Sequence, residues 1–387
     1  MNPSNQKFSS NLKKKLLVII FTFQRIEMSL SANYRKRNLK FEFVARTSRG
    51  SFREKDSYYI ILKEGETIGI GEVSPLKGLS VDDVPEIENE IASTLQKMEG
   101  LNSGEIFSDI SEFLKHHIDD RFPSIRFGIE TALMDLKNGG SLTIYPGAFE
   151  KSESGIEING LIWMGDLEFM LTQITTKIYD GFRCIKIKIG SLDFERECDI
   201  LKYVRNKYFR DKIEIRVDAN GAFKPEVALE KLDILFEYDL HSIEQPIKPG
   251  QKDVMKSLCR QTPIPIVLDE ELIGIHKQSE MLSLLEFIRP QYIVLKPTLL
   301  GGFISCNQWI ECAEKLEIGW WVTSALESNI GLNAICQYTD NLSVKIPQGL
   351  GTGELFTNNI PSPLEIKKSE IRLNKYKNWD VSEILKE

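Results

Sequence analysis

Apolar and polar positions change their spacing along the chain. The first part alternates apolar and polar side chains over short runs, which is typical of strands with one buried face. We expect these strands at residues 39–46, 58–63 and 67–73. Apolar positions then recur every three or four residues, which predicts helices at residues 81–98, 104–117 and 124–138. Strands joined by short turns and followed by helices predict a separate α+β domain.

From residue 156 onward, short apolar strands alternate with amphipathic helices. The strands are expected at residues 156–163, 184–189, 213–217, 242–244, 264–268, 292–295 and 320–323, with an eighth near residues 342–346. Such alternation predicts a parallel sheet, and about eight units over roughly 200 residues fit a closed α/β barrel. Active sites of these barrels lie at the carboxyl ends of the strands, so polar residues there are the candidates for function.

Two lysines share one face of the second barrel strand. Lys186 and Lys188 are two residues apart and point the same way, while Ile185 and Ile187 point to the opposite face. If the isoleucines face the helices, both ammonium groups enter the barrel. Their repulsion and burial would favour a neutral amine, which suits a general base.

Carboxylates end the next three strands. Asp218, Glu244 and Asp269 each follow an apolar strand at intervals of about one strand–helix unit, so we expect them to converge. Three close carboxylates repel one another unless a cation holds them together. An all-oxygen set of ligands selects a hard ion, which predicts a Mg²⁺ site.

A further lysine, Lys296, ends the sixth strand and should lie across the barrel from Lys188. A buried lysine without a role would be costly, so the lysines and acids are best explained together. They suit the abstraction of a proton next to a carboxylate, because a metal and an ammonium group can stabilise the resulting enediolate.

The order Lys-x-Lys, Asp-x-Asn, Glu-Gln-Pro, Asp-Glu and Lys-Pro resembles the muconate-lactonizing-enzyme subgroup of the enolase superfamily, from about Asn38 onward. The resemblance implies an α/β fold, a (β/α)7β modified TIM barrel at residues 151–350. It also implies an α+β capping domain at residues 38–150 and a tail at residues 351–387 that returns to this domain.

The same resemblance implies roles for the polar residues at the strand ends. Lys188 would be the base, Lys186 would tune it, and Lys296 would stabilise the enediolate. The Mg²⁺ ligands would be Asp218, Glu244 and Asp269. Asn220 would orient these ligands without binding the ion itself.

Segments 158–163, 324–331 and 348–353 narrow the resemblance within the subgroup. They resemble the lyases that dehydrate 2-succinyl-6-hydroxy-2,4-cyclohexadiene-1-carboxylate to o-succinylbenzoate in menaquinone biosynthesis. The partner would then be a small carboxylate substrate. Contacts with it are expected from Asn159, Gly302, Ser324, Glu327 and the capping loop at residues 76–79. Glu327 has an alternative role near the first turn of a helix, where the helix dipole favours a carboxylate.

An epimerase or racemase of dipeptides or N-acylamino acids is the alternative on this scaffold, since two lysines on opposite sides of a substrate also suit racemisation. Dipeptide epimerases usually carry Asp-x-Asp after a late strand, whereas residues 324–329 read Ser-Ala-Leu-Glu-Ser-Asn. An N-acylamino acid racemase side activity remains compatible with the sequence. A barrel that only binds a ligand would not need both lysines and all three acids.

Composition narrows the possible partners and the compartment. The net charge of −7 argues against a nucleic-acid partner, because phosphate binding needs a basic surface. The six cysteines form no C-x-x-C pair and no zinc spacing with the four histidines. Free thiols in a reducing compartment, and hence a cytoplasmic protein, are the expectation.

The first residues carry a basic cluster before an apolar run at residues 16–23, which is too short to span a bilayer. We interpret residues 1–37 as an extension that is disordered or artefactual, with Met28 as the true start.

A chain that starts at Met28 should therefore be as stable and as active as the full chain. Thermal unfolding and turnover of the two proteins, measured side by side, check this expectation. A large loss of melting temperature in the shorter chain would show that residues 16–23 pack against a domain.

Overall fold

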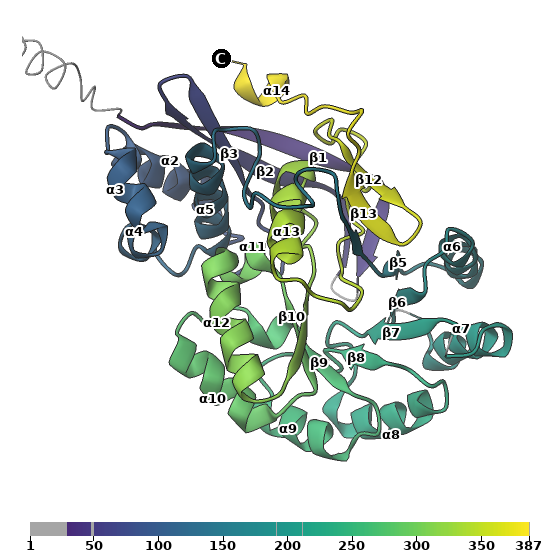
Figure 1. The fold of residues 1–387 in the computed structure, drawn as a ribbon. Coiled ribbons are helices and arrows are strands. Elements are labelled where there is room, and N and C mark those ends of the chain that lie inside the picture. Colours follow the sequence, from purple (N-terminus) through teal and green to yellow (C-terminus); the bar gives the residue numbers. More distant parts are fainter. Residues whose placement is uncertain (1–28, 48–49, 191, 211, 387) are drawn as a thin grey trace, which may run out of the picture.

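The computed structural model describes residues 29–47, 50–190, 192–210 and 212–386. These residues form a capping domain, a barrel and a C-terminal tail that lies beside the capping domain (Figure 1). No helix within the described ranges is long and apolar enough to cross a membrane. Of the extension predicted at residues 1–37, residues 1–28 fall outside these ranges.

The capping domain begins with a three-stranded antiparallel sheet in the order β1-β2-β3. The strands are β1 (Ser31–Thr47), β2 (Gly50–Glu64) and β3 (Thr67–Val73). The expected strand at residues 39–46 thus starts earlier, and the proposed domain boundary at residue 38 cuts through β1. The correction has a physical basis, because residues 31–37 pair with the Ser57–Lys63 part of β2.

Helices cover one side of this sheet. They are α2 (Ile87–Met98), α3 (Ser103–Ser108), α4 (Ile110–His117) and α5 (Pro123–Lys137). The single helix expected at residues 104–117 is divided, because the Asp109 side chain caps α4 by accepting from the Glu112 N–H at 2.9 Å. Gly69 and Gly71 let α5 approach β3 closely, since a Cβ at Gly71 would lie 1.9 Å from the Gly128 carbonyl oxygen.

Seven parallel strands curl into the barrel in the order β5 to β11. They are β5 (Gly160–Ile162), β6 (Cys184–Lys188), β7 (Glu214–Asp218), β8 (Ser242–Glu244), β9 (Ile266–Leu268), β10 (Tyr292–Leu295) and β11 (Gly319–Val322). All seven main strand predictions are confirmed within a few residues. Residues 156–163, however, divide into β4 (Gly155–Glu157) and β5, because β4 pairs with the C-terminal tail.

The barrel closes through residues 348 and 349. Gln348 pairs with Ile158 and Gly349 with Thr323, both in parallel orientation, so this segment lies between the first and last strands. The eighth strand expected at residues 342–346 is therefore wrong by a few positions. Residues 342–346 instead follow the end of a helix, and the apolar pattern alone did not reveal which residues reach the gap.

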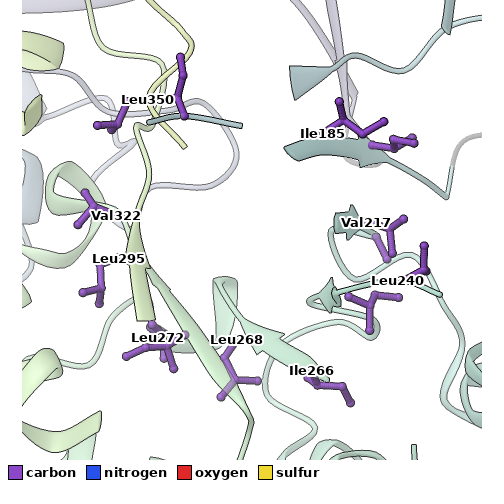
Figure 2. Packing of buried hydrophobic residues seen from close by; sticks show 14 of the residues in the cluster. Ile185, Val217, Leu240, Ile266, Leu268, Leu272, Leu295, Val322 and Leu350 are labelled. Atoms are coloured by element: carbon purple, nitrogen blue, oxygen red, sulfur yellow. The ribbon is translucent and has the colours of Figure 1, made fainter. Parts of the chain in front are cut away.

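Helices surround the barrel (Figure 1). They are α6 (Leu167–Tyr179), α7 (Phe194–Lys207), α8 (Pro225–Phe236), α9 (Lys252–Gln261), α10 (Gln278–Ile288), α11 (Pro297–Leu300), α12 (Gly302–Lys315) and α13 (Asn329–Asn341), with a short 3₁₀ turn η1 (Glu270–Leu272). Alternate strand residues such as Ile185, Val217 and Leu295 belong to the buried core cluster that also includes helix residues (Figure 2). The intervening residues therefore point into the barrel.

The tail runs back to the capping domain. It contains β12 (Leu364–Lys367), β13 (Glu370–Leu373) and α14 (Ser382–Leu385), and β13 pairs with β4. Main-chain hydrogen bonds link Glu42 N to Leu355 O and Thr357 N to Lys40 O, both at 2.9 Å. These bonds attach the tail to β1 beside the barrel mouth.

Two buried carboxylates of the capping domain hold barrel helices. Glu130 of α5 accepts from the Phe303 N–H at 2.7 Å and the Ile304 N–H at 3.2 Å, at the start of α12. Glu72 of β3 accepts from the Ser328 N–H at 2.9 Å and the Gly331 N–H at 2.8 Å, at the start of α13. Helix N-termini expose unpaired N–H groups, so these carboxylates join the two domains by completing helices.

The Glu130 contact predicts a pH dependence of stability. Burial raises the pKa of Glu130 to about 8 from an ordinary value of 4.5. The contribution of such a group is fully present below pH 4.5 and is lost as the pH rises through 8. The wild type should therefore lose free energy of unfolding relative to Glu130→Gln across this window, by at most about 1.4 kcal/mol per pH unit.

Urea unfolding of both proteins at several pH values measures this difference. Glu112→Gln, at a solvent-exposed carboxylate of α4, is the control and should show no such trend. A difference between wild type and Glu130→Gln that stays constant with pH would contradict the assignment.

Candidate active site

The expected polar residues meet at the carboxyl ends of the barrel strands. Several of them line a cavity of about 670 Å³, a volume that includes space open to solvent. The lining contains Lys186, Lys188, Asp218, Asn220 and Lys296. Lys186 and Asp218 are buried, and the other two lysines are half-buried. Lys188 from the end of β6 and Lys296 from the end of β10 thus line the same cavity.

Asp218 joins the two lysines of β6. Its Oδ2 atom lies 3.0 Å from the Nζ of Lys186 and 3.0 Å from the Nζ of Lys188. Lys188 also donates to Asn220 Oδ1 at 2.8 Å. The spacing of Lys186 and Lys188 predicts direct repulsion between their two ammonium groups. The structure instead places a shared carboxylate beside both, which offsets that repulsion.

The remaining carboxylates pair with lysines as well. Glu244 Oε2 lies 2.6 Å from the Nζ of Lys186, and Asp269 accepts a hydrogen bond from Lys296. Among the residues described, no group of three His, Cys, Asp or Glu side chains is arranged to hold a metal ion as it stands. The acids thus reach the same end of the barrel. Their oxygens contact lysine ammonium groups there and do not point to one shared position.

Burial and charge shift the pKa values of these groups. Although burial alone would raise it, Lys186 and Lys188 hold the pKa of Asp218 well below its ordinary value. Burial and the Asp218 charge together raise the pKa of Glu244 to about 8. Burial acts to lower the pKa of Lys296, but Asp269 and Glu244 outweigh it and raise this pKa. Lys296 is therefore charged at neutral pH.

The ligand set still fits a divalent cation. Glu244 Oε1 is buried and has no hydrogen-bond partner among the described residues, so one carboxylate oxygen is available in the polar cluster. Asp218 and Glu244 are register partners on neighbouring strands, and Asp269 follows the next strand. Hard carboxylate oxygens from adjacent strand ends are what such an ion requires.

Gln245 fixes the position of Asp269. Its Oε1 atom accepts from the Asp269 N–H at 3.1 Å and from the Glu271 N–H at 3.3 Å. The backbone of Gln245 has a φ of 40°, which turns the chain sharply after β8. The Glu-Gln-Pro motif thus places one carboxylate through its glutamate and orients the next strand end through its glutamine.

The rest of the cavity lining consists of a polar and an apolar set of side chains. Asn159, Thr323, Ser324 and Thr352 form the polar wall, where Ser324 Oγ lies 2.5 Å from Thr352 Oγ1. The apolar wall contains Leu76, Leu79, Leu161, Trp163, Ala325 and Leu326. The expected contacts Asn159, Ser324 and the loop at residues 76–79 do line the cavity. Thr323 was not among the expected contacts, because nothing in the sequence separates it from an ordinary strand residue, and Leu161 was marked only as part of the segment at residues 158–163.

Two of the expected substrate contacts lie elsewhere. Gly302 has a φ of 91°, and a Cβ there would lie 1.9 Å from Glu130 Oε2, so this glycine serves the contact between the domains. Glu327 is fully buried and accepts from the Ala325 N–H at 2.8 Å and from Thr298 Oγ1. Neither residue is part of the cavity lining. The alternative structural role of Glu327 near the start of α13 agrees with these contacts.

Two family profiles match the chain. Residues 170–374 match the enolase C-terminal domain-like family. Residues 39–136 match the N-terminal domain of MenC. The boundary between these matches lies in the region between α5 and the start of the barrel helices, as the fold requires.

Comparison with individual proteins gives the same assignment. The o-succinylbenzoate synthase of Desulfotalea psychrophila is 43% identical over 87% of this chain and 97% of its own length. The crystal structure of MenC from the same organism has a TM-score of 0.81 at 40% identity, covering 89% of this chain and 100% of that one.

The fold extends to proteins with other activities. A dipeptide epimerase from Enterococcus faecalis, solved with Mg and a dipeptide, has a TM-score of 0.78 at 19% identity, covering 91% and 98% of the two chains. That likeness concerns the fold alone, whereas the identity to the synthase extends across both domains. This chain is a member of the o-succinylbenzoate synthase family within the enolase superfamily.

Proposed function

We propose that this chain catalyses the Mg²⁺-dependent dehydration of 2-succinyl-6-hydroxy-2,4-cyclohexadiene-1-carboxylate to o-succinylbenzoate, a step of menaquinone biosynthesis. The observation that carries the proposal is one cavity lined by Lys188 and Lys296, with strand-end carboxylates beside both lysines. The 43% identity to a synthase that makes this product specifies the reaction among those that such a cavity permits.

Asp218, Glu244 and Asp269 would hold the Mg²⁺ ion. Lys186 and Lys296 would then exchange hydrogen bonds to these carboxylates for other partners, because the ion takes the place of their charge. When bound, the ion supplies positive charge that stabilises the dianion formed from the substrate carboxylate. The enolase superfamily supports a divalent metal in general, and the all-oxygen ligand set favours magnesium.

Lys188 would carry the proton in both halves of the elimination. Its neutral amine takes the proton from the carbon next to the carboxylate, which breaks the C–H bond and leaves an enediolate. The resulting ammonium group gives that proton to the departing hydroxyl, so the C–O bond breaks and water leaves from the same face of the ring. Asn220 and Asp218, at 2.8 and 3.0 Å, orient the Lys188 Nζ toward the cavity.

Lys296 would act by its charge. The raised pKa of this lysine keeps an ammonium group at the wall of the cavity, where negative charge develops on the substrate. The aliphatic wall of Leu76, Leu79 and Leu326 suits the cyclohexadiene ring. Since aromatisation drives the reaction, moderate complementarity to the rest of the substrate suffices.

The small carboxylate substrate is the only partner that the proposal needs. We also place the protein in the cytoplasm, because all six cysteines are free and buried, as in proteins of reducing compartments.

Removal of the metal should abolish turnover. EDTA is expected to stop formation of the aromatic product, and added Mg²⁺ should restore it. Asp218→Asn should raise the Mg²⁺ concentration needed for half-maximal binding by at least about tenfold, measured by calorimetry, since even residues that only support metal ligands cost that much. Asp253→Asn, at an exposed acid of α9, is the control. Full activity of metal-free enzyme would refute the proposal.

Substitutions of the two lysines should impair different parts of the reaction. Lys188→Ala should reduce turnover by at least about 10⁴-fold and abolish exchange of the substrate α-proton with solvent, while Mg²⁺ still binds. Lys296→Arg keeps the positive charge and should retain more activity than Lys188→Arg. Proton exchange followed by NMR separates the roles, which are reversed if exchange survives in the Lys188 variant and disappears in the Lys296 variant.

The same assay tests the alternative activity. α-Proton exchange on N-succinylamino acids, compared with aromatic product formation under the same conditions, measures any racemase side activity. Dehydration that is much slower than racemisation would assign the chain to the alternative.

A further inference from the structure

Lys55 is a buried lysine that lies outside the barrel. It belongs to β2 of the capping domain and is only 6% exposed. Its Nζ donates to Ser74 Oγ at 2.8 Å and Leu326 O at 3.1 Å, with Ser74 O at 3.4 Å. A buried ammonium group is costly unless several acceptors surround it, so this arrangement requires an explanation.

The two partners of Lys55 belong to two different segments that line the cavity or precede its lining. Ser74 directly follows β3 and begins the capping loop that supplies Leu76 and Leu79. Leu326 belongs to the barrel loop after β11 and lines the cavity itself. One ammonium group therefore links a segment of the capping domain to a segment of the barrel, and both segments form the apolar wall.

The barrel segment needs to be held in place. Leu326 has a φ of 63°, in the left-handed region that a branched side chain rarely adopts. The carbonyl oxygen that Lys55 contacts belongs to this same residue. Glu72 holds the chain two residues later, through the Ser328 N–H. The capping domain thus holds the loop at residues 324–328 at two places, through the Lys55 amino group and through the Glu72 carboxylate.

Apolar packing joins the same segments. Leu76 and Leu326 belong to one buried cluster with Trp163 of the barrel, Leu39 of β1 and Phe356 of the tail. Such packing is non-directional and fixes the separation of the segments only loosely. Hydrogen bonds from a single ammonium group add the direction that the apolar contacts lack.

We propose that Lys55 is a positioning residue for the substrate cavity, which fixes the capping loop and the loop at residues 324–328 relative to each other. It touches neither the substrate nor the strand-end carboxylates, and it acts through Ser74 and Leu326. The proposal rests on the proposed function only in taking the cavity as the place where substrate binds.

Two effects act on the pKa of Lys55 in opposite directions, and burial is the larger. Burial lowers the pKa of Lys55, whereas Glu72 and Glu327 oppose this shift. The acceptors of its hydrogen bonds are carbonyl and hydroxyl oxygens, so a side chain of similar length that has no donor would leave them unpaired.

Hydrogen exchange of the free protein tests the positioning directly. Lys55→Met keeps the length and removes the donor, so amides at residues 74–79 and 323–328 should exchange roughly tenfold faster than in the wild type. Lys137→Met is the matched control, because it removes another lysine-to-carbonyl hydrogen bond of the capping domain, to Phe107 O at 2.9 Å, and lies away from the cavity. It should leave both segments unchanged. Unchanged exchange in Lys55→Met would overturn the proposal whatever the enzyme does.

Kinetics then test the consequence for substrate. Lys55→Met should raise KM about tenfold and change kcat less than about threefold, whereas Lys137→Met should change neither. Lys55→Arg, which restores a donor, should bring KM back toward the wild-type value. A loss of kcat as large as that of Lys188→Ala would overturn the positioning role in favour of a catalytic one. Faster exchange without any change in KM would overturn the link to the substrate.

A milder variant covers the case in which Lys55→Met does not fold. Ser74→Ala removes the 2.8 Å hydrogen bond and leaves the lysine in place. It should accelerate exchange at residues 74–79 more than at residues 323–328, since the contact to Leu326 remains. Equal or absent acceleration in both segments would contradict the assignment. If exchange behaves as expected and no substrate is turned over by the wild type, the proposed reaction fails while the positioning role stands.

Discussion

The mutual repulsion of carboxylates at the end of the barrel is the constraint on which the site depends. Parallel strands bring Asp218, Glu244 and Asp269 to one edge, and burial removes the water that would screen them. Cations must therefore be present. Lys186 forms ion pairs with Asp218 and Glu244, and Lys296 forms one with Asp269. The same need for positive charge that keeps the folded chain stable also makes the edge a place where a metal can bind and where a substrate anion can be stabilised.

This constraint explains why a second domain covers the barrel. The charged edge is open at the carboxyl ends of the strands, and water there would weaken every electrostatic interaction inside. The capping domain supplies Leu76 and Leu79 over the opening. Its attachment uses buried carboxylates at the starts of two barrel helices, so the docking is directional as well as apolar. The tail adds Leu355 and Phe356 to the apolar cluster at the mouth.

The wider fold leaves room for several reactions. A dipeptide epimerase shares this architecture at 19% identity, so the barrel itself does not select the substrate. The rest of the cavity lining comes from residues 159–163, from the loop after β11, from residues 349–352 and from the capping domain. The loop after β11 is held by contacts across the domain boundary, from Lys55 to Leu326 O and from Glu72 to the Ser328 N–H.

Local sequence determined the parts of this protein that follow from short-range periodicity. Alternation of isoleucine and lysine in residues 185–188 fixed which side chains enter the barrel, because a strand has a period of two. An acid after each apolar strand placed Asp218, Glu244 and Asp269 at one edge, since each strand–helix unit repeats the same direction. The N-cap Asp109 is a local signal as well. The apolar pattern nevertheless predicts one helix at residues 104–117, where Asp109 begins a second one.

Tertiary structure decided what depends on partners distant in the chain. The closing segment lies at residues 348–349 rather than 342–346, because the gap between β5 and β11 selects it and apolar pattern does not. Gly302 leaves room for the Glu130 side chain, and Glu327 accepts a hydrogen bond from Thr298. Folding brings these groups together although they lie far apart in the sequence and follow no regular spacing. Lys55 reads in sequence as an ordinary strand lysine, and only the docking of two domains makes it a link between cavity walls. Burial is a property of the assembled chain, so the cost of an unpaired charge arises only after folding and is settled by whichever residues then lie within reach.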